Sequence, residues 1–132
     1  MAQLLAVFDV TQAVLDDGHP ILHADEPILY RAGRAAVGAD CVVSVGGGTI
    51  TDVAKVAAER AGVPVHVVVQ TAASVDGYTD NFAVVLQNGV KKILPSRWPE
   101  AVLADTTTIA QAPRHLSASG FGLVDADVQR AR

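Results

Sequence analysis

Three consecutive glycines, Gly46–Gly48, follow a short run of β-branched residues and precede Thr49 and Ile50. A strand that turns directly into a helix directs several free backbone N–H groups at one point, where the helix dipole also favours negative charge. Because glycine lacks a Cβ, a phosphate group can approach the backbone closely. The turn can therefore hold a pyrophosphate, with the Thr49 hydroxyl as a further donor. The alternative is a turn that only lets a helix pack closely on a sheet, and the turn alone does not decide between the two.

Two common phosphate-binding fingerprints do not fit this turn. The dinucleotide-binding pattern G-x-G-x-x-G requires a further glycine where Thr51 stands. The P-loop requires Gly-Lys-Ser/Thr, and Gly48 is followed by Thr49 rather than by lysine. Phosphate binding here would therefore use neither pattern.

Two strand–helix units surround the turn. Asp25 can cap a helix over residues 25–38, and a second helix is expected over residues 49–62. The short β-branched runs 41–45 and 65–69 predict strands. Strand, helix and strand in this order predict a parallel pair with a right-handed crossover. The fold class is therefore α/β, a Rossmann-like parallel sheet flanked by helices, and runs that are apolar on both faces predict helices on each side.

A polar loop and a hairpin follow the second strand. Residues 70–80 have no hydrophobic period and leave the carboxyl end of a strand, which is where open α/β sheets bind ligands. Asn88-Gly89 between two apolar runs predicts a β-hairpin insertion. Further expected elements are a strand at 101–104, short helices within 106–112 and 113–119, and a frayed tail at 125–132.

Composition and charge exclude several classes of partner. The 132 residues, 50% of them hydrophobic, can form one domain with a core. A net charge of −4 without a basic stripe argues against nucleic acid as a partner. Apolar runs end well before the roughly 20 residues that a membrane span needs. The single cysteine, Cys41, suits a reducing compartment, and the N-terminus lacks the basic start of a signal peptide, so a cytoplasmic protein is expected.

The turn, the following helix and the loop together carry a family resemblance. The segments GGGTITDVAK at 46–55 and QTAASVDGY at 70–78 resemble the sn-glycerol-1-phosphate dehydrogenase family. That family lies within the iron-containing alcohol dehydrogenase and dehydroquinate synthase-like group. The first segment is shared by the whole group, whereas the second is similar to the glycerol-1-phosphate branch. The resemblance implies a dehydroquinate synthase-like N-terminal domain.

The resemblance also implies site residues by position. Thr71 and Ser74 match residues that line the cofactor near its nicotinamide, and Asp76 matches an acidic residue that contacts the substrate. Asp80 stands where relatives often have a serine that touches the cofactor. The residues that match the turn holding the pyrophosphate of NAD or NADP are Gly46, Gly47, Gly48, Thr49 and Ile50.

Three other polar residues have more modest interpretations. Asp52 and Lys55 both match the helix of the family. Asp52 is interpreted first as a charge near the helix N-terminus, and Lys55 is interpreted as a cofactor or substrate contact. His66 alternates within an expected buried strand, which favours a hydrogen-bonded core histidine over a catalytic one.

The metal site of the family has no counterpart where it is expected. Relatives follow the run Gly120-Phe121-Gly122 with an acidic ligand of a catalytic Zn²⁺, Fe²⁺ or Ni²⁺, and Leu123 stands there instead. The remaining ligands of the family are histidines of a following helical domain. A divalent metal is therefore expected only in full-length relatives. Residues 1–122 are expected to form an N-terminally shortened NAD(P)-binding domain and residues 123–132 a divergent tail.

The leading hypothesis is an NAD(P)-dependent glycerol-1-phosphate dehydrogenase-like oxidoreductase. The resemblance implies reduction of dihydroxyacetone phosphate, a phosphorylated small molecule, to sn-glycerol 1-phosphate for phospholipid biosynthesis, with the chain alone inactive. One alternative is a sugar-phosphate cyclase of the dehydroquinate synthase type, and another is a truncated, non-catalytic nucleotide-binding module. Part of the hydrophobic fraction is expected to face the helical domain of full-length relatives, so an exposed apolar patch, or a homo-oligomer that covers it, is expected.

Overall fold

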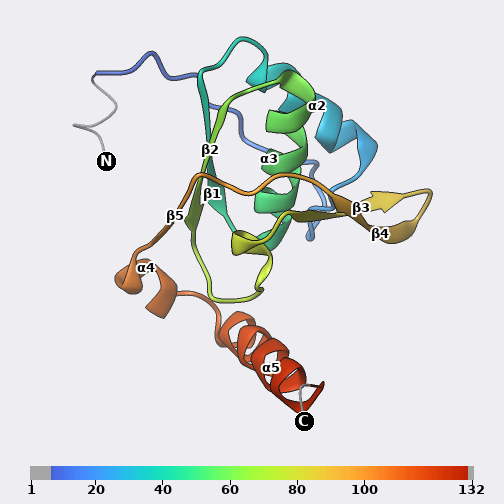
Figure 1. The fold of residues 1–132 in the computed structure, drawn as a ribbon, viewed down its shortest axis with the longest axis vertical. Coiled ribbons are helices and arrows are strands. Elements are labelled where there is room, and N and C mark those ends of the chain that lie inside the picture. Colours follow the sequence, from blue (N-terminus) through green and yellow to red (C-terminus); the bar gives the residue numbers. More distant parts are fainter. Residues whose placement is uncertain (1–6, 131–132) are drawn as a thin grey trace.

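The structure is a computed structural model that describes residues 7–130 (Figure 1). The elements in chain order are α2 Glu26–Ala36, β1 Cys41–Gly46, α3 Gly48–Ala61, β2 Val65–Gln70, the 3₁₀ turn η1 Gly77–Thr79, β3 Phe82–Gln87, β4 Val90–Pro95, β5 Ala101–Ala104, α4 Thr106–Ala110 and α5 Arg114–Arg130.

The three strands β1, β2 and β5 form one parallel sheet in that order. Cys41 pairs with Val65, and Gly46 pairs with Gln70, so β1 and β2 end side by side. The crossover between them is α3. The predicted α/β class and the parallel strand–helix–strand unit are confirmed, and the carboxyl ends of these strands meet at one edge of the sheet.

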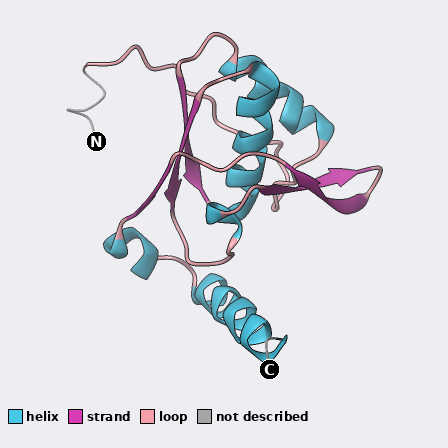
Figure 2. Cartoon of the chain, viewed as in Figure 1, coloured by secondary structure: helices cyan, strands magenta, loops and turns pink. Residues whose placement is uncertain are grey.

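Helices α2 and α3 lie together on one face of the sheet (Figure 2). Asp25 caps α2 as predicted, with its Oδ1 accepting from the Ile28 N–H at 3.2 Å. Gly62 ends α3 in the left-handed conformation, at φ 66°. The larger apolar core is formed by Ala24, Ile28, Leu29, Ala32, Val53, Val56, Ala57, Ala83 and Val85. It joins both helices to the hairpin.

The opposite face of the sheet is apolar and open. Val43, Val45 and Leu103 are 57%, 52% and 55% exposed, whereas Ser44 and Val68 on the helical face are buried. Within residues 7–130, helices cover this sheet on one face, so the expected second helical layer is not seen there. The expected exposed apolar patch is confirmed, and a homo-oligomer stays a prediction.

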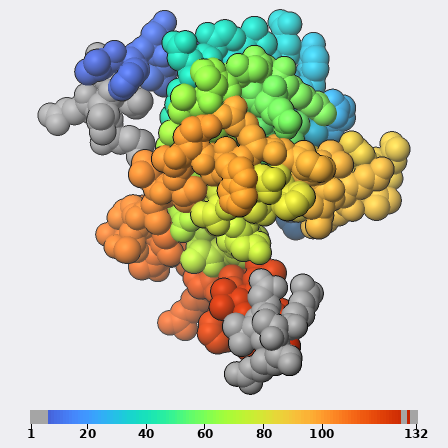
Figure 3. Space-filling model, viewed as in Figure 1, coloured from blue at the N-terminus to red at the C-terminus, as the bar shows by residue number. Residues whose placement is uncertain are grey.

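The hairpin β3–β4 projects from the body of the molecule (Figure 3). Its turn has φ 52° at Asn88 and φ 76° at Gly89, the two positive angles that a type I′ hairpin turn requires. The Leu86 N–H donates to the Ala24 carbonyl at 2.8 Å and anchors the hairpin to the segment before α2. The Asn-Gly prediction is confirmed.

The C-terminal segment differs from its predicted form. Helix α5 continues without a break from Arg114 to Arg130, so a frayed tail at 125–130 is not what the structure shows, and residues 131–132 lie outside the described residues. The expected boundary between Gly122 and Leu123 falls inside this helix. No helix within residues 7–130 is long and apolar enough to span a membrane.

Candidate functional site

The glycine turn lies at the carboxyl end of β1, where α3 begins. Gly47 is the N-cap residue of α3, at φ −85° and ψ −168°, and no side chain among residues 7–130 caps the helix. The first N–H groups of this helix are therefore free of side-chain acceptors and face the edge of the sheet. This is the arrangement that binds an anionic group.

The three glycines differ in what surrounds them. A Cβ on Gly46 would lie 2.7 Å from Ile50 Cγ1, and one on Gly48 would lie 2.9 Å from Val75 Cγ2. Close packing therefore explains these two glycines. For Gly47 the nearest described atom to such a Cβ is Tyr78 Oη at 4.0 Å, and the φ of −85° suits any residue. Neither packing nor backbone conformation therefore accounts for the absence of a side chain at Gly47.

The loop that follows β2 lies against the same turn. The Thr71 N–H donates to the Gly46 carbonyl at 3.1 Å. Tyr78 Oη donates to the Ala72 carbonyl at 2.8 Å and lies 3.2 Å from Ser74 Oγ, and both Ser74 and Tyr78 are buried. The loop is thus ordered by its own hydrogen bonds next to the strand end.

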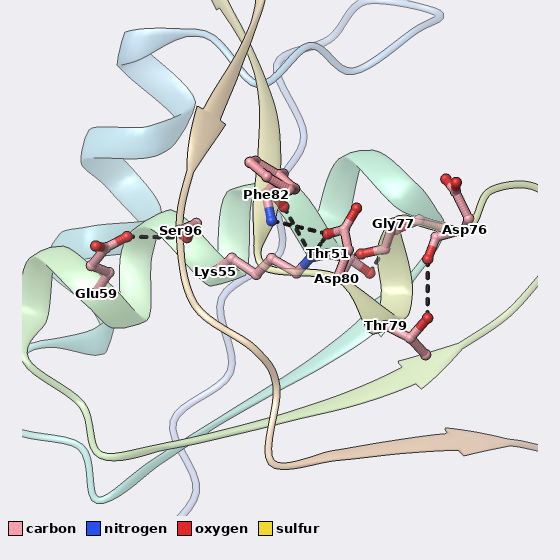
Figure 4. A network of polar contacts seen from close by, with 10 residues as sticks. Thr51, Lys55, Glu59, Asp76, Gly77, Thr79, Asp80, Phe82 and Ser96 are labelled. Atoms are coloured by element: carbon pink, nitrogen blue, oxygen red, sulfur yellow. Dashed lines mark hydrogen bonds and ion pairs between the residues drawn. The ribbon is translucent and has the colours of Figure 1, made fainter.

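Asp76 begins the 3₁₀ turn η1, and its side chain is exposed. Its carbonyl oxygen accepts from the Thr79 N–H at 3.1 Å and from Thr79 Oγ1 at 3.3 Å. Figure 4 shows the Asp76 carboxylate directed away from Lys55. The carboxylate is therefore accessible to a ligand.

Lys55 has a different role from the one that the sequence suggested. Its side chain is fully buried, and Nζ donates to the Gly77 carbonyl at 2.5 Å, Asp80 Oδ1 at 2.6 Å and the Phe82 carbonyl at 2.9 Å. An ammonium group has three protons to donate, and these three oxygens use them. The prediction of direct cofactor or substrate contact by Lys55 is therefore wrong for this structure.

The structure gathers most of the predicted site residues at one edge of the sheet. Thr71 bonds to the glycine turn, and Val75 of the loop packs on Gly48. Asp80 instead pairs with Lys55, on the far side of η1 from Asp76. Which of these residues touches a cofactor stays a prediction. Sequence reasoning missed Tyr78, and its one signal was an aromatic residue within an otherwise small and polar loop.

The half-buried Asp52 and the buried His66 have pKa values that are shifted in opposite directions. Burial raises the pKa of Asp52 to about 6, although the Val84 N–H and the charge of Lys55 oppose the shift and Asp80 adds to it. Burial lowers the pKa of His66 to about 4, helped by the charge of Arg97. His66 is buried and its Nε2 lies 3.0 Å from Ser44 Oγ, as predicted for a core histidine, but its Nδ1 is buried without a hydrogen-bond partner among the described residues.

The stability of the chain should therefore depend on pH through two opposing contributions. The Asp52 carboxyl binds its proton more tightly in the folded chain than in the unfolded chain. Its contribution to the free energy of unfolding therefore falls as pH rises from 3.8 to about 6. His66 is harder to protonate when folded, so its contribution rises as pH rises from about 4 to 6.5. Relative to wild type, Asp52→Asn should gain about 1–2 kcal/mol of unfolding free energy across the first range, allowing for partial solvent screening. His66→Gln should lose a similar amount across the second.

Urea unfolding of the wild type and both variants at intervals from pH 4 to 7 measures these differences. Subtracting the wild-type free energy of unfolding from that of each variant at the same pH cancels the contributions of the other carboxylates, because these titrate alike in all three proteins. A difference for Asp52→Asn that does not change with pH would show that the Asp52 carboxyl is solvated in the folded chain.

The described residues do not fit the metal of the family. Within residues 7–130, no group of three or more histidine, cysteine, aspartate or glutamate residues is placed to hold an ion. Leu123 lies on α5 at the expected ligand position, and its side chain has no donor atom. A catalytic site of this type needs about three protein ligands. No metal-dependent step is derived for this chain.

A parallel sheet with an open glycine turn at the end of a strand is typical of nucleotide-binding α/β domains. Comparison with known proteins then identifies the family. The model of the iron-containing alcohol dehydrogenase family matches residues 2–113. The chain belongs to this family, as the resemblance implied.

Individual relatives agree with this assignment. The chain is 38% identical over 100 residues to the glycerol-1-phosphate dehydrogenase [NAD(P)+] of Bacillus velezensis, covering 75% of this chain and 25% of that protein. It is 38% identical over 129 residues to the enzyme of the same name from Halalkalibacterium halodurans, covering 92% and 31%. The crystal structure of a probable glycerol dehydrogenase from Sinorhizobium meliloti superposes with a TM-score of 0.71 at 32% identity, covering 76% and 29%. The chain thus spans a quarter to a third of these relatives.

Proposed function

We propose that this chain is the NAD(P)-binding part of a glycerol-1-phosphate dehydrogenase-like oxidoreductase. The observation that carries the proposal is Gly47, which stands at an uncapped helix N-terminus with no packing or backbone reason to lack a side chain. The names of the relatives from Bacillus velezensis and Halalkalibacterium halodurans support NAD(P) as the ligand. The pyrophosphate would lie at Gly46–Ile50, and the nicotinamide side near Thr71, Ser74 and Asp76.

The proposed substrate is dihydroxyacetone phosphate, reduced to sn-glycerol 1-phosphate. The nicotinamide supplies the hydride when bound, and a divalent metal in full-length relatives would polarise the carbonyl. This chain's own contribution is to orient the cofactor, with the N–H groups of α3 neutralising the pyrophosphate. The exposed Asp76 carboxylate can accept a hydrogen bond from a substrate hydroxyl.

The cofactor assignment predicts saturable binding of NADH or NADPH to the purified chain. Calorimetric titration with each nucleotide measures it, and comparison of the two decides between NAD and NADP. A titration that saturates with neither nucleotide would overturn the proposal.

A second candidate is a non-catalytic nucleotide-binding module, and Leu123 at the ligand position favours it. Because the described residues lack a metal-ligand set, we expect the chain alone to bind the nucleotide without turnover. Oxidation of NADH in the presence of dihydroxyacetone phosphate and Zn²⁺ measures this directly. Measurable turnover by the chain alone would exclude the module and favour the complete enzyme.

A further inference from the structure

The buried Lys55 ammonium lies beneath the loop that carries the candidate nicotinamide-side residues. Lys55 is seven positions after Gly48 on α3, so it lies about two helical turns below the glycine turn. Its three acceptors, on Gly77, Asp80 and Phe82, all belong to the segment directly after Asp76 (Figure 4). One side chain of α3 therefore holds η1 and the start of β3.

A buried ammonium group strongly restricts the segment around it. A charge out of water must keep its oxygen partners, and loss of one partner leaves an uncompensated charge. Asp80 Oδ1 also accepts from the Phe82 N–H at 3.1 Å, so the carboxylate holds the start of β3 as well as the ammonium group. The segment cannot shift without breaking contacts that Lys55 requires.

The same loop is fixed to the glycine turn at two further points. The Thr71 N–H bonds to the Gly46 carbonyl, and Val75 packs against Gly48. Between them, Tyr78 Oη holds the Ala72 carbonyl. Because α3 carries both the turn and Lys55, the ammonium sets how the loop lies relative to the turn.

We propose that Lys55, with Asp80, is a positioning residue for the nicotinamide side of the cofactor site. In this role Lys55, which is fully buried, acts by fixing the loop that presents Thr71 and Asp76, and Asp80 acts through its ion pair with Lys55. The identity of the ligand rests on the proposed function. The pyrophosphate side depends on the glycine turn, which does not require Lys55.

The test compares binding of NADH with binding of ADP-ribose, which has the pyrophosphate and lacks the nicotinamide. The variants are Lys55→Met and the milder Asp80→Asn, and the matched control is Lys91→Met on the exposed strand β4. We expect the Kd for NADH to rise at least tenfold in Lys55→Met and severalfold in Asp80→Asn, with the Kd for ADP-ribose within twofold of wild type. Lys91→Met should change neither. If Lys55→Met does not fold, Asp80→Asn carries the test.

Amide hydrogen exchange supplies a second readout that needs no ligand. The N–H groups of Thr71, Thr79 and Phe82 should exchange faster in both variants, while those in the middle of α3 keep wild-type rates. Wild-type NADH affinity in a folded Lys55→Met variant, or unchanged loop exchange in both variants, would overturn the positioning role. Failure of the wild type to bind NADH and ADP-ribose would overturn the proposed function, and the exchange rates would still decide whether Lys55 holds the loop.

Discussion

The Gly47→Ser variant is expected to bind NAD(P)H at least tenfold more weakly than wild type without loss of stability. Gly47 is the N-cap of α3, and serine is among the preferred residues at that position. The new Cβ meets no described atom closer than Tyr78 Oη at 4.0 Å. The free energy of unfolding should therefore stay equal or rise by a few tenths of a kcal/mol.

The affinity of Gly47→Ser for NAD(P)H should fall, although its stability does not, for two reasons. The serine Oγ would accept from N–H groups of the first turn of α3, which are the donors that a pyrophosphate needs. The side chain would also occupy the space through which the phosphate approaches the backbone. Loss of charge-assisted hydrogen bonds of about 1.5–3 kcal/mol corresponds to at least a tenfold rise in Kd.

The matched comparison is Gly46→Ala, because packing explains that neighbouring glycine. Its Cβ would lie 2.7 Å from Ile50 Cγ1, so this variant should lose stability as well as affinity. Urea unfolding and calorimetry on both variants separate the two effects. Equal NAD(P)H affinity in Gly47→Ser and wild type would leave close helix–sheet packing as the reason for the glycine turn.

The unit β1–α3–β2 was predictable because its signals are local. Short β-branched runs bounded by glycine and proline predict strands, and a right-handed crossover leaves one arrangement for two parallel strands. The hairpin was predictable for the same reason, since Asn88 and Gly89 adopt the two positive φ angles that the turn needs. These patterns predict the carboxyl ends of β1 and β2, and therefore the edge of the sheet where the candidate site lies.

The burial of Lys55 was not predictable from local signals. Lysine is almost always exposed unless it is paired, and the acceptors of Lys55 lie 22 to 27 positions further along the chain. The sequence predicts the helix that carries Lys55, but the path of a loop without hydrophobic period depends on tertiary contacts. Assignment of Lys55 as a ligand contact failed for this reason.

The continuation of helix α5 beyond the expected segment 113–119 was missed because hydrophobic periodicity indicates burial rather than helicity. A helix that buries no continuous stripe has no reason to show an apolar period of 3.6 residues. Phe121 and Val124 are 76% and 63% exposed, in agreement with this interpretation. The loss of apolar pattern from residue 125 onward predicted a frayed tail, whereas residues 125–130 continue the helix.

The Gly120→Ala variant is expected to displace α5 from the loop that follows β2. A Cβ at this position would lie 2.1 Å from the Ala73 carbonyl oxygen and 2.9 Å from the Ala73 carbonyl carbon. Both are backbone atoms, so no rotation of a side chain relieves the overlap. Nonbonded carbon and oxygen atoms rest more than about 3 Å apart, so the helix or the loop must move by roughly 1 Å.

The effect should reach the candidate site because Ala73 is next to Ser74, whose hydroxyl contacts Tyr78. Overpacking against a fixed backbone costs about 1–3 kcal/mol, while alanine gains about 1 kcal/mol over glycine within a helix. The contact between α5 and the loop, rather than the folded core, should therefore be lost. Faster amide exchange in the loop and in α5, with unchanged exchange in α3, is the expected measurement.

Gly122→Ala provides the control on the same helix. A Cβ there meets no atom of the described chain within 4 Å, so the variant receives the same gain in helix propensity without the overlap. We expect slower exchange in α5 for Gly122→Ala and faster exchange for Gly120→Ala. If both variants slow exchange equally, α5 does not dock through Gly120. The close approach to Ala73 would then have no role in holding the loop beside the glycine turn.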